Sequence, residues 1–140
     1  MSCENLFELN LFFRKQNIAG NCNLLMKQKV LIIDDEIDFC IIMKGYFEKR
    51  NFHVFTAHDI QTGLFCINDV KPDVLFLDNN LPDGQGWQYV EQIVEKNNHL
   101  KIYLISAHQS KASFTSTNKN IEVWEKPISL QILNAEFQEK

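Results

Sequence analysis

Polar side chains that could do chemistry stand directly after four short apolar stretches of the sequence. The stretches are rich in Val, Ile and Leu, which favours buried strands of a parallel sheet. In such a sheet, the residues that follow the carboxyl ends of the strands lie along one edge, where ligands bind. We therefore expect three carboxylates, a hydroxyl and an ammonium group to meet there. These groups belong to Asp34, Asp35, Asp78, Ser106 and Lys126.

Three carboxylates that lie close together repel one another, so at neutral pH they need a bound cation or raised pKa values. All of these candidate ligand atoms are oxygens, which favour a hard divalent ion. Mg²⁺ is the usual ion where phosphate is also present, and Mn²⁺ has similar ligand preferences. The pattern therefore predicts a divalent metal site.

Each of these residues, taken singly, has a commoner interpretation. The acidic pair could stand at a helix N-terminus, where the helix dipole favours negative charge. Asp78 and Ser106 could be turn or capping residues, and Lys126 could be a solvated charge. Their joint occurrence behind apolar strands favours one shared site over several unrelated roles.

The elements that would position these side chains alternate between strand and helix from Lys27 onward. Such alternation gives a parallel sheet with helices on both faces and right-handed crossovers. The expected strands cover residues 30–33, 53–56, 73–77, 101–105 and 121–124. The expected helices cover residues 36–50, 60–70 and 86–96, and a last short helix is capped by Ser129. The first of these helices should bury one face made of Ile37, Cys40, Met43 and Phe47.

The composition fits one globular domain and excludes two classes of partner. With 140 residues, 45 % of them hydrophobic, the chain is long enough for a single sizeable core. Its net charge of -4 gives no electrostatic basis for binding nucleic acid. No apolar run reaches the roughly 18 residues of a membrane span. The four cysteines are widely spaced, so we interpret them as reduced thiols of a cytoplasmic protein.

Residues 1–26 precede the first expected strand and form an N-terminal extension. An apolar stretch over residues 6–13 is interrupted by Asn10 and followed by Arg14 and Lys15. A secretory signal would have its positive charges before the apolar stretch, so we do not expect one. The extension is either poorly ordered or a short amphipathic helix that docks on the domain or on a partner.

Taken together and in this order, the acidic pair, Asp78, Ser106 and the Lys126-Pro127 pair resemble the receiver domain of response regulators. The resemblance covers residues 27–140 and implies a flavodoxin-like, doubly wound sheet of five parallel strands in the order 2-1-3-4-5. It also implies a phosphoacceptor module of two-component signalling. Because the chain ends after the last expected helix, we expect a stand-alone receiver without an output domain.

The resemblance implies a role for each residue of the site. Asp78 is the phosphoacceptor, since a carboxylate can take a phosphoryl group in line and form an acyl phosphate. Lys126 neutralises charge on the phosphoryl oxygens, and the Ser106 hydroxyl and the Ala107 backbone N–H donate hydrogen bonds to them. The Lys126-Pro127 peptide bond is expected to be cis. The metal ligands are Asp34, Asp35, Asp78 and the backbone carbonyl of Asn80.

The function implied is that of a regulatory domain and not of an enzyme. Asp78 would accept a phosphoryl group from the phosphohistidine of a sensor histidine kinase or a histidine phosphotransfer protein, and binding to a downstream protein would change. Two alternatives stay open. One is an adaptor of the same fold that binds its partner regardless of phosphate, and the other is a Mg²⁺-dependent aspartyl-phosphate phosphohydrolase. Hydrolases of the haloacid-dehalogenase type need a second Asp two residues after the nucleophile, where this chain has Asn80.

The side of the domain that would report the signal departs from the family pattern. The family usually has an aromatic residue three positions before the lysine, where this chain has Val123. Because side chains alternate along a strand, Trp124 should lie on the opposite face. We therefore predict that the usual aromatic switch is absent and that the polar residues 107–120 carry the response. His108 is predicted to make the phosphoryl lifetime depend on pH, whereas His58 is interpreted as solvated.

Overall fold

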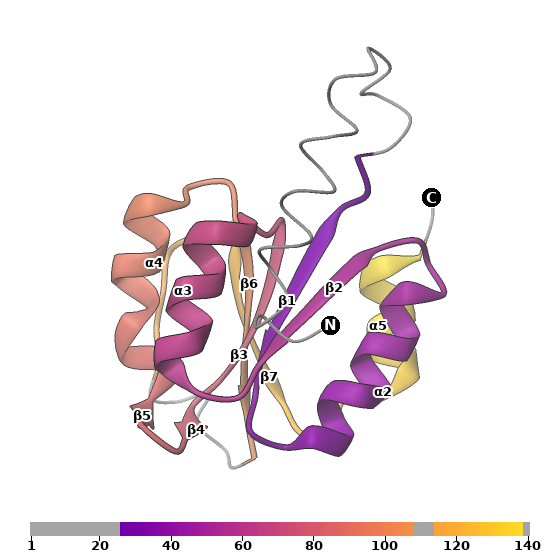
Figure 1. Cartoon of the computed structure of the whole chain (residues 1–140), viewed down its shortest axis with the longest axis horizontal. Helices are drawn as coiled ribbons and strands as arrows, with labels where there is room; N and C mark the ends of the chain where they lie inside the picture. The colour runs from indigo at the N-terminus through magenta and orange to yellow at the C-terminus, as the bar shows by residue number, and fades with distance from the viewer. Residues whose placement is uncertain (1–25, 108–113, 139–140) are drawn as a thin grey trace.

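The computed structural model describes residues 26–107 and 114–138, and within them five parallel strands form one sheet. The strand order is β2-β1-β3-β6-β7 (Figure 1). This is the predicted order 2-1-3-4-5, because β6 and β7 are the fourth and fifth strands of the sheet. The flavodoxin-like fold is therefore confirmed, while the N-terminal extension lies outside the described residues except for Met26.

The chain alternates between strands and helices, apart from a small hairpin after the third strand. The strands are β1 (Lys29–Ile33), β2 (His53–Ala57), β3 (Val74–Asp78), β4 (Asn80–Leu81), β5 (Gly84–Gln85), β6 (Lys101–Ser106) and β7 (Ile121–Glu125). The α-helices are α2 (Ile37–Glu48), α3 (Ile60–Val70), α4 (Val90–Lys96) and α5 (Leu130–Phe137). A 3₁₀ turn, η4 (Gly86–Tyr89), precedes α4.

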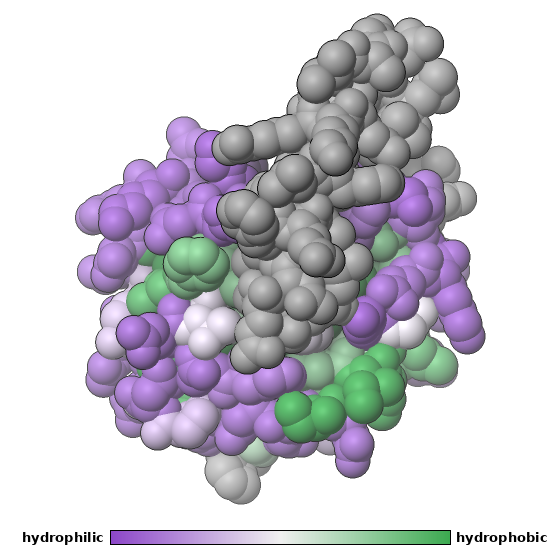
Figure 2. Space-filling view, viewed as in Figure 1, coloured by the Kyte–Doolittle hydropathy of each residue, from purple (hydrophilic) through white to green (hydrophobic). Residues whose placement is uncertain are grey.

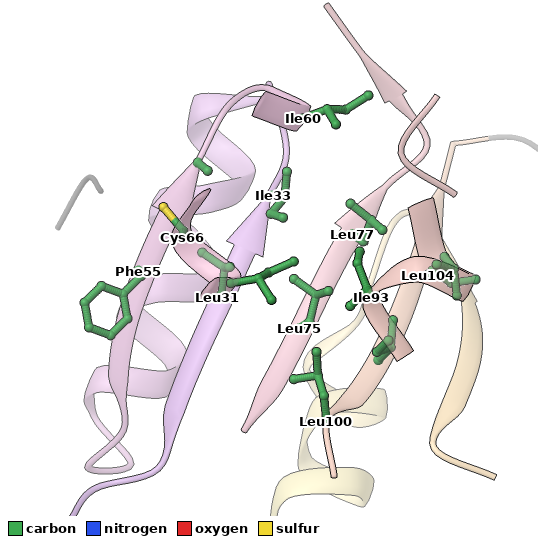
Figure 3. Close-up of a cluster of buried hydrophobic side chains, with 14 of the residues drawn as sticks. Leu31, Ile33, Phe55, Ile60, Cys66, Leu75, Leu77, Ile93, Leu100 and Leu104 are labelled. Atoms are coloured by element: carbon green, nitrogen blue, oxygen red, sulfur yellow. The ribbon is translucent and has the colours of Figure 1, made fainter. Parts of the chain in front are cut away.

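Helices cover both faces of the sheet, α3 and α4 on one face and α2 and α5 on the other (Figure 1). Side chains alternate along each strand, so Leu31 and Leu75 face α3 and α4, whereas Ile32 and Phe76 face α2 and α5. Figure 3 shows the first of these two cores, with leucines of neighbouring strands packed side by side. Because both faces are buried, the central strands are apolar throughout.

The core under α2 and α5 is dominated by aromatic rings. Phe76 stacks on Tyr103 with the ring centroids 4.9 Å apart, and Trp124 lies 4.5 Å from Tyr103. Phe137 of α5 meets Phe47 of α2 edge to face at 4.9 Å. Aromatic pairs of this kind contribute about 0.5–1.5 kcal/mol each beyond the area they bury. The rings therefore hold α5 firmly against the sheet, together with the turn that joins it to β7.

The elements agree with the sequence prediction to within two residues at most ends, as helix boundaries usually do. The β4–β5 hairpin was not predicted, because strands of two residues are too short to show periodicity. Ile37 was expected in the buried face of α2, but its side chain is 52 % exposed. Among the described helices, none has the length and apolar character that crossing a bilayer requires.

The cysteines on α2 and α3 are buried as predicted but differ in redox state. Cys40 is a free thiol, whose pKa burial raises to about 12. Cys66 is disulfide-bonded, so the prediction of reduced thiols is wrong for this residue. Disulfide partners need to be close in space but need not be close in sequence. The spacing of the cysteines along the chain therefore did not indicate this bond.

Candidate functional site

The predicted site residues meet at one edge of the sheet because the strands run in register. Asp34 follows β1, and Asp78 is the last residue of β3, the neighbouring strand. Ser106 is the last residue of β6 and lies level with Glu125 of β7, the residue before Lys126. Asp34, Asp78 and Ser106 are buried, with exposed fractions of 0 %, 4 % and 6 %. Polar groups this deeply buried lower the stability of the fold unless they are paired or bind a ligand.

The Lys126 side chain reaches into the acidic cluster. Its Nζ atom lies 2.7 Å from Oδ2 of Asp34 and 3.0 Å from Oε1 of Glu36. The same atom lies 3.6 Å from Oδ1 of Asp78, and it stands over the ring of Phe39 at 4.6 Å. One ammonium group thus faces three carboxylates. It cannot neutralise all of them, so the cluster keeps an excess of negative charge.

The pKa values of the cluster reflect this imbalance. Burial raises the pKa of Asp78 from 3.8 to about 6, and the negative charge of Asp34 adds to the rise. Burial also raises the pKa of Asp34, against the opposing effect of Lys126. Burial lowers the pKa of Lys126, but its contacts with Asp34 and Glu36 outweigh burial and raise this pKa overall. The site therefore favours binding of either protons or a cation.

The donor set fits a hard divalent cation. Carboxylate oxygens of Asp34, Asp35 and Asp78 lie within 4.8 Å of one another. The Asp34 Oδ2 atom is buried and, although it lies near Lys126, no hydrogen-bond donor of the described residues meets it with suitable geometry. A buried oxygen of this kind, among oxygen ligands with uncompensated charge, suits Mg²⁺. The backbone of Asn80 adjoins the cluster, since its N–H donates to Oδ2 of Asp78 at 3.0 Å.

The loop after β3 is held against the sheet by Asn79 and Trp87. The backbone N–H of Trp87 donates to Oδ1 of Asn79 at 3.2 Å, and its indole Nε1–H donates to the Leu77 carbonyl at 3.2 Å. Gly86 lies so close that a Cβ atom there would collide with the carbonyl oxygen of Asp78. These contacts fix the backbone on both sides of Asp78 and so fix the position of its carboxylate.

Ser106 and Ala107 stand at the end of β6, on the other side of the cluster. The backbone N–H of Lys126 donates to the Ser106 carbonyl at 2.9 Å, which ties the end of β7 to β6. The Lys126-Pro127 peptide bond is cis, as expected. Ala107 is exposed. His108 lies outside the described residues, so its predicted effect on the phosphoryl lifetime stays a prediction.

Three residues for which the sequence predicted no role at the site also support it. Glu36 pairs with Lys126. His58 lies in a loop as interpreted but is half-buried, and its Nδ1 atom lies 2.8 Å from the carbonyl oxygen of Asp34, a contact that was not predicted. Asp83 of the β4–β5 hairpin accepts hydrogen bonds from the first two backbone N–H groups of α3. The last two contacts join loops that follow different strands, and only the strand order brings such loops together.

Val123 and Trp124 lie on opposite faces of β7, as predicted. Val123 packs against the core under α3 and α4, and Trp124 packs against the core under α2 and α5. The face that usually carries an aromatic residue therefore carries a small, β-branched one. Beside it, Phe114 meets Trp87 edge to face with the ring centroids 5.9 Å apart. The prediction that residues 107–120 carry the response is untested by these contacts.

Comparison with the sequence models of known families shows to which family the chain belongs. The sequence model of one family, described as "Response regulator receiver domain", matches residues 30–135 and thus every predicted site residue. This chain belongs to that family. It is therefore a receiver of the kind found in the response regulators of two-component systems, and its parallel sheet has the strand order expected of them.

Individual relatives agree with this assignment. The transcriptional regulatory protein YxdJ of Bacillus subtilis is 30% identical over 112 residues, which are 79% of this chain and 48% of YxdJ. The chain thus spans about half the length of this relative. A two-component response regulator from Clostridium difficile is 28% identical with a TM-score of 0.71, and the match covers 79% of this chain and 92% of that one. TrrA of Thermotoga maritima, crystallised with Mg²⁺-BeF, shares the fold at 20% identity and a TM-score of 0.68, over 78% of this chain and 95% of its own.

Proposed function

We propose that this receiver accepts a phosphoryl group on Asp78 from a phosphohistidine, with the assistance of Mg²⁺. The observation that carries the proposal is the meeting of Asp34, Asp35, Asp78 and Lys126 at one edge of the sheet. The receiver itself would comprise residues 27–140 and would act in the cytoplasm, in keeping with its family. It would regulate a partner and would not turn over an external substrate.

In the proposed reaction, a carboxylate oxygen of Asp78 attacks the phosphorus atom in line. A P–O bond forms while the P–N bond of the phosphohistidine breaks, and its electron pair stays on the imidazole nitrogen. Lys126 supports the proposal because its Nζ atom is already 3.6 Å from Oδ1 of Asp78, where it could pair with the phosphoryl oxygens. The Ser106 hydroxyl and the Ala107 backbone N–H would donate hydrogen bonds to the same oxygens.

A divalent ion would occupy the acidic part of the site. Asp34, Asp35, Asp78 and the backbone carbonyl of Asn80 would hold Mg²⁺, and Mn²⁺ would substitute for it. When bound, the ion would neutralise charge on the carboxylates and on the transferred phosphoryl group. The raised pKa of Asp78 supports this assignment, because an ion that neutralises the cluster also keeps Asp78 in the ionised form that attacks.

A protein donor is supported by the surface beside the site. Ile37 and Ile41 of α2 are 52% and 62% exposed, and Ile37 directly follows Glu36. Figure 2 shows an apolar area over α2. Leu130 at the start of α5, four residues after Lys126, is 61% exposed. Single exposed apolar residues are ordinary, but a group beside a reactive carboxylate fits a docking surface for another protein.

The proposal is tested by transfer from protein donors. Histidine kinases and phosphotransfer proteins carrying a labelled phosphoryl group would be mixed with the wild type and with Asp78→Asn. We expect label on the wild type only. Ile41→Lys should slow transfer from a protein donor by about tenfold, since a buried unpaired charge at an interface is costly. It should leave labelling by the small donor phosphoramidate unchanged.

Phe65→Lys is the matched control for the docking surface, because Phe65 is 60% exposed on α3, across the sheet from α2. This variant should accept label from both donors at the wild-type rate. Label on Asp78→Asn would contradict the assignment of the phosphoacceptor. Continuous release of phosphate from an external substrate would favour the phosphohydrolase, and absence of label with every donor would favour the adaptor.

A further inference from the structure

The segment that joins β2 to the first turn of α3, residues 58–61, is called here the β2–α3 turn, and it contacts two parts of the metal site. One part is the acidic turn after β1, which contains Asp34 and Asp35. The other part is the β4–β5 hairpin, which begins at Asn80. Because the strand order is β2-β1-β3, the turn that follows β2 reaches the acidic turn directly. Both parts are hydrogen-bonded to it, through different side chains.

His58 makes the contact with the acidic turn. Its Nδ1 atom lies 2.8 Å from the backbone carbonyl oxygen of Asp34. A carbonyl oxygen only accepts hydrogen bonds, so Nδ1 must carry the proton and donate it. The Cys40 thiol donates to the same oxygen at a longer 3.4 Å, and the Asp34 N–H donates to the Ala57 carbonyl at 3.0 Å. The backbone of Asp34 is therefore fixed on both sides, with His58 as the closer donor to its carbonyl.

Asp83 makes the contact with the hairpin. Its Oδ1 and Oδ2 atoms accept hydrogen bonds from the backbone N–H groups of Ile60 and Gln61, at 2.8 Å and 3.0 Å. These N–H groups lower the pKa of the Asp83 carboxyl, so it is ionised at neutral pH. The helix already has its own N-cap, since Asp59 accepts from the N–H of Thr62 at 2.6 Å. Asp83 is therefore not needed to begin α3, and its bonds tether the hairpin to the turn.

We propose that His58 and Asp83 are positioning residues for the divalent metal site, each holding one part of it on the β2–α3 turn. This inference rests on the proposed function, because it assumes that the acidic cluster binds Mg²⁺. His58 would hold the backbone from which the side chains of Asp34 and Asp35 project. Asp83 would hold the hairpin, and with it the Asn80 carbonyl. Neither residue would touch the ion.

The test is the Mg²⁺ dissociation constant of the full chain, measured by calorimetry, with Mn²⁺ binding followed by electron paramagnetic resonance as a second measurement. Residues that orient metal ligands typically contribute about tenfold or more to metal affinity. We expect His58→Ala and Asp83→Ala each to weaken Mg²⁺ binding by about tenfold. Because they act on separate parts of the site, the double variant should lose about a hundredfold.

Conservative variants distinguish positioning from a general loss of stability. The side-chain amide of asparagine can donate from nearly the place of a histidine Nδ1, so His58→Asn should bind Mg²⁺ within about twofold of the wild type. The matched controls are His99→Ala and Asp69→Ala, which remove an exposed histidine before β6 and an exposed carboxylate near the far end of α3. Both controls should keep the wild-type affinity.

Two results would overturn the inference. The first is a Mg²⁺ dissociation constant that is unchanged in His58→Ala and Asp83→Ala. This result would count against the inference whether or not the melting temperature of the metal-free protein falls. The second is an equal loss of affinity in His58→Asn and His58→Ala. In either case, a wild type that binds Mg²⁺ and is labelled by phosphoramidate would leave the proposed function standing. A wild type that neither binds Mg²⁺ nor takes label would contradict the proposed function and this inference together.

Discussion

Removing the charge of Asp78 should make the metal-free protein more stable at neutral pH. The Asp78 side chain is 4 % exposed, and burial is the main cause that raises its pKa from 3.8 to about 6. Since a tenfold change in an ionisation constant corresponds to about 1.4 kcal/mol, ionised Asp78 costs the native state about 3 kcal/mol. Asp78→Asn removes the charge and keeps an oxygen that accepts from the Asn80 N–H. We therefore expect a gain in the free energy of unfolding of about 3 kcal/mol at pH 7.5.

The pH dependence of this gain follows from the direction of the shift. The folded-state pKa of Asp78 lies above its unfolded value, so the native state binds more protons between about pH 4 and pH 6. The free energy of unfolding of the wild type therefore falls as the pH rises through this window. The penalty is nearly absent below about pH 3 and nearly complete above about pH 7. The advantage of Asp78→Asn should shrink to about 1 kcal/mol at pH 4.5.

The assay is urea unfolding in the presence of EDTA at pH 4.5 and pH 7.5. Comparing the two pH values isolates the charge, because other effects of the substitution change little with pH. Asp38→Asn is the matched control, since Asp38 is exposed in the first turn of α2 and its loss should cost only about 0.5 kcal/mol. Equal stability of Asp78→Asn and wild type at pH 7.5, or an equal gain at both pH values, would refute the reasoning.

Further predictions concern the lysine, the ion and the response. Lys126→Met should lower the free energy of unfolding by about 3 kcal/mol at pH 7.5, because Asp34 loses its buried partner; a loss below about 1 kcal/mol would contradict the importance of this pair. Mg²⁺ at about one hundred times its dissociation constant should stabilise the wild type by about 2.7 kcal/mol. Asp35→Ala should lose most of that gain, and an unchanged gain would remove Asp35 from the ligands. With beryllofluoride and Mg²⁺, hydrogen exchange should change mainly in residues 107–120, and a change centred on Trp124 would show that the response takes the other face.

The sequence predicted the fold well because apolar strands alternating with helices indicate a parallel sheet, and the resemblance to receiver domains supplied the strand order. Residues such as Leu31 and Leu75 lie in strands that are apolar on both faces, and this pattern is specific to a parallel sheet covered by helices. The register of the strands then places Asp34 and Asp78 at the same edge. Candidate site residues that follow strands could therefore be predicted without knowing any side-chain contact.

Contacts between loops could not be predicted in this way. Neither the short β4–β5 hairpin nor the contact of His58 with Asp34 leaves a periodic pattern, since each depends on how loops of neighbouring strands meet. The contact of Glu36 with Lys126 could not be predicted either, because a carboxylate in that position could equally have extended into solvent. The disulfide at Cys66 likewise depends on proximity in space. Sequence patterns identified the strands that carry the site, but the residues that orient it came only from the three-dimensional arrangement.

The central claim is that Asp78 is the phosphoacceptor, and intact-mass analysis after incubation with phosphoramidate and Mg²⁺ tests it most directly. Asp78→Asn keeps the shape of the site but has no carboxylate to attack phosphorus. We predict that the wild type gains the mass of one phosphoryl group and that Asp78→Asn gains none. With EDTA in place of Mg²⁺, the wild type should also stay unlabelled. Equal labelling of the two proteins, or no labelling of the wild type with Mg²⁺ present, would contradict the claim.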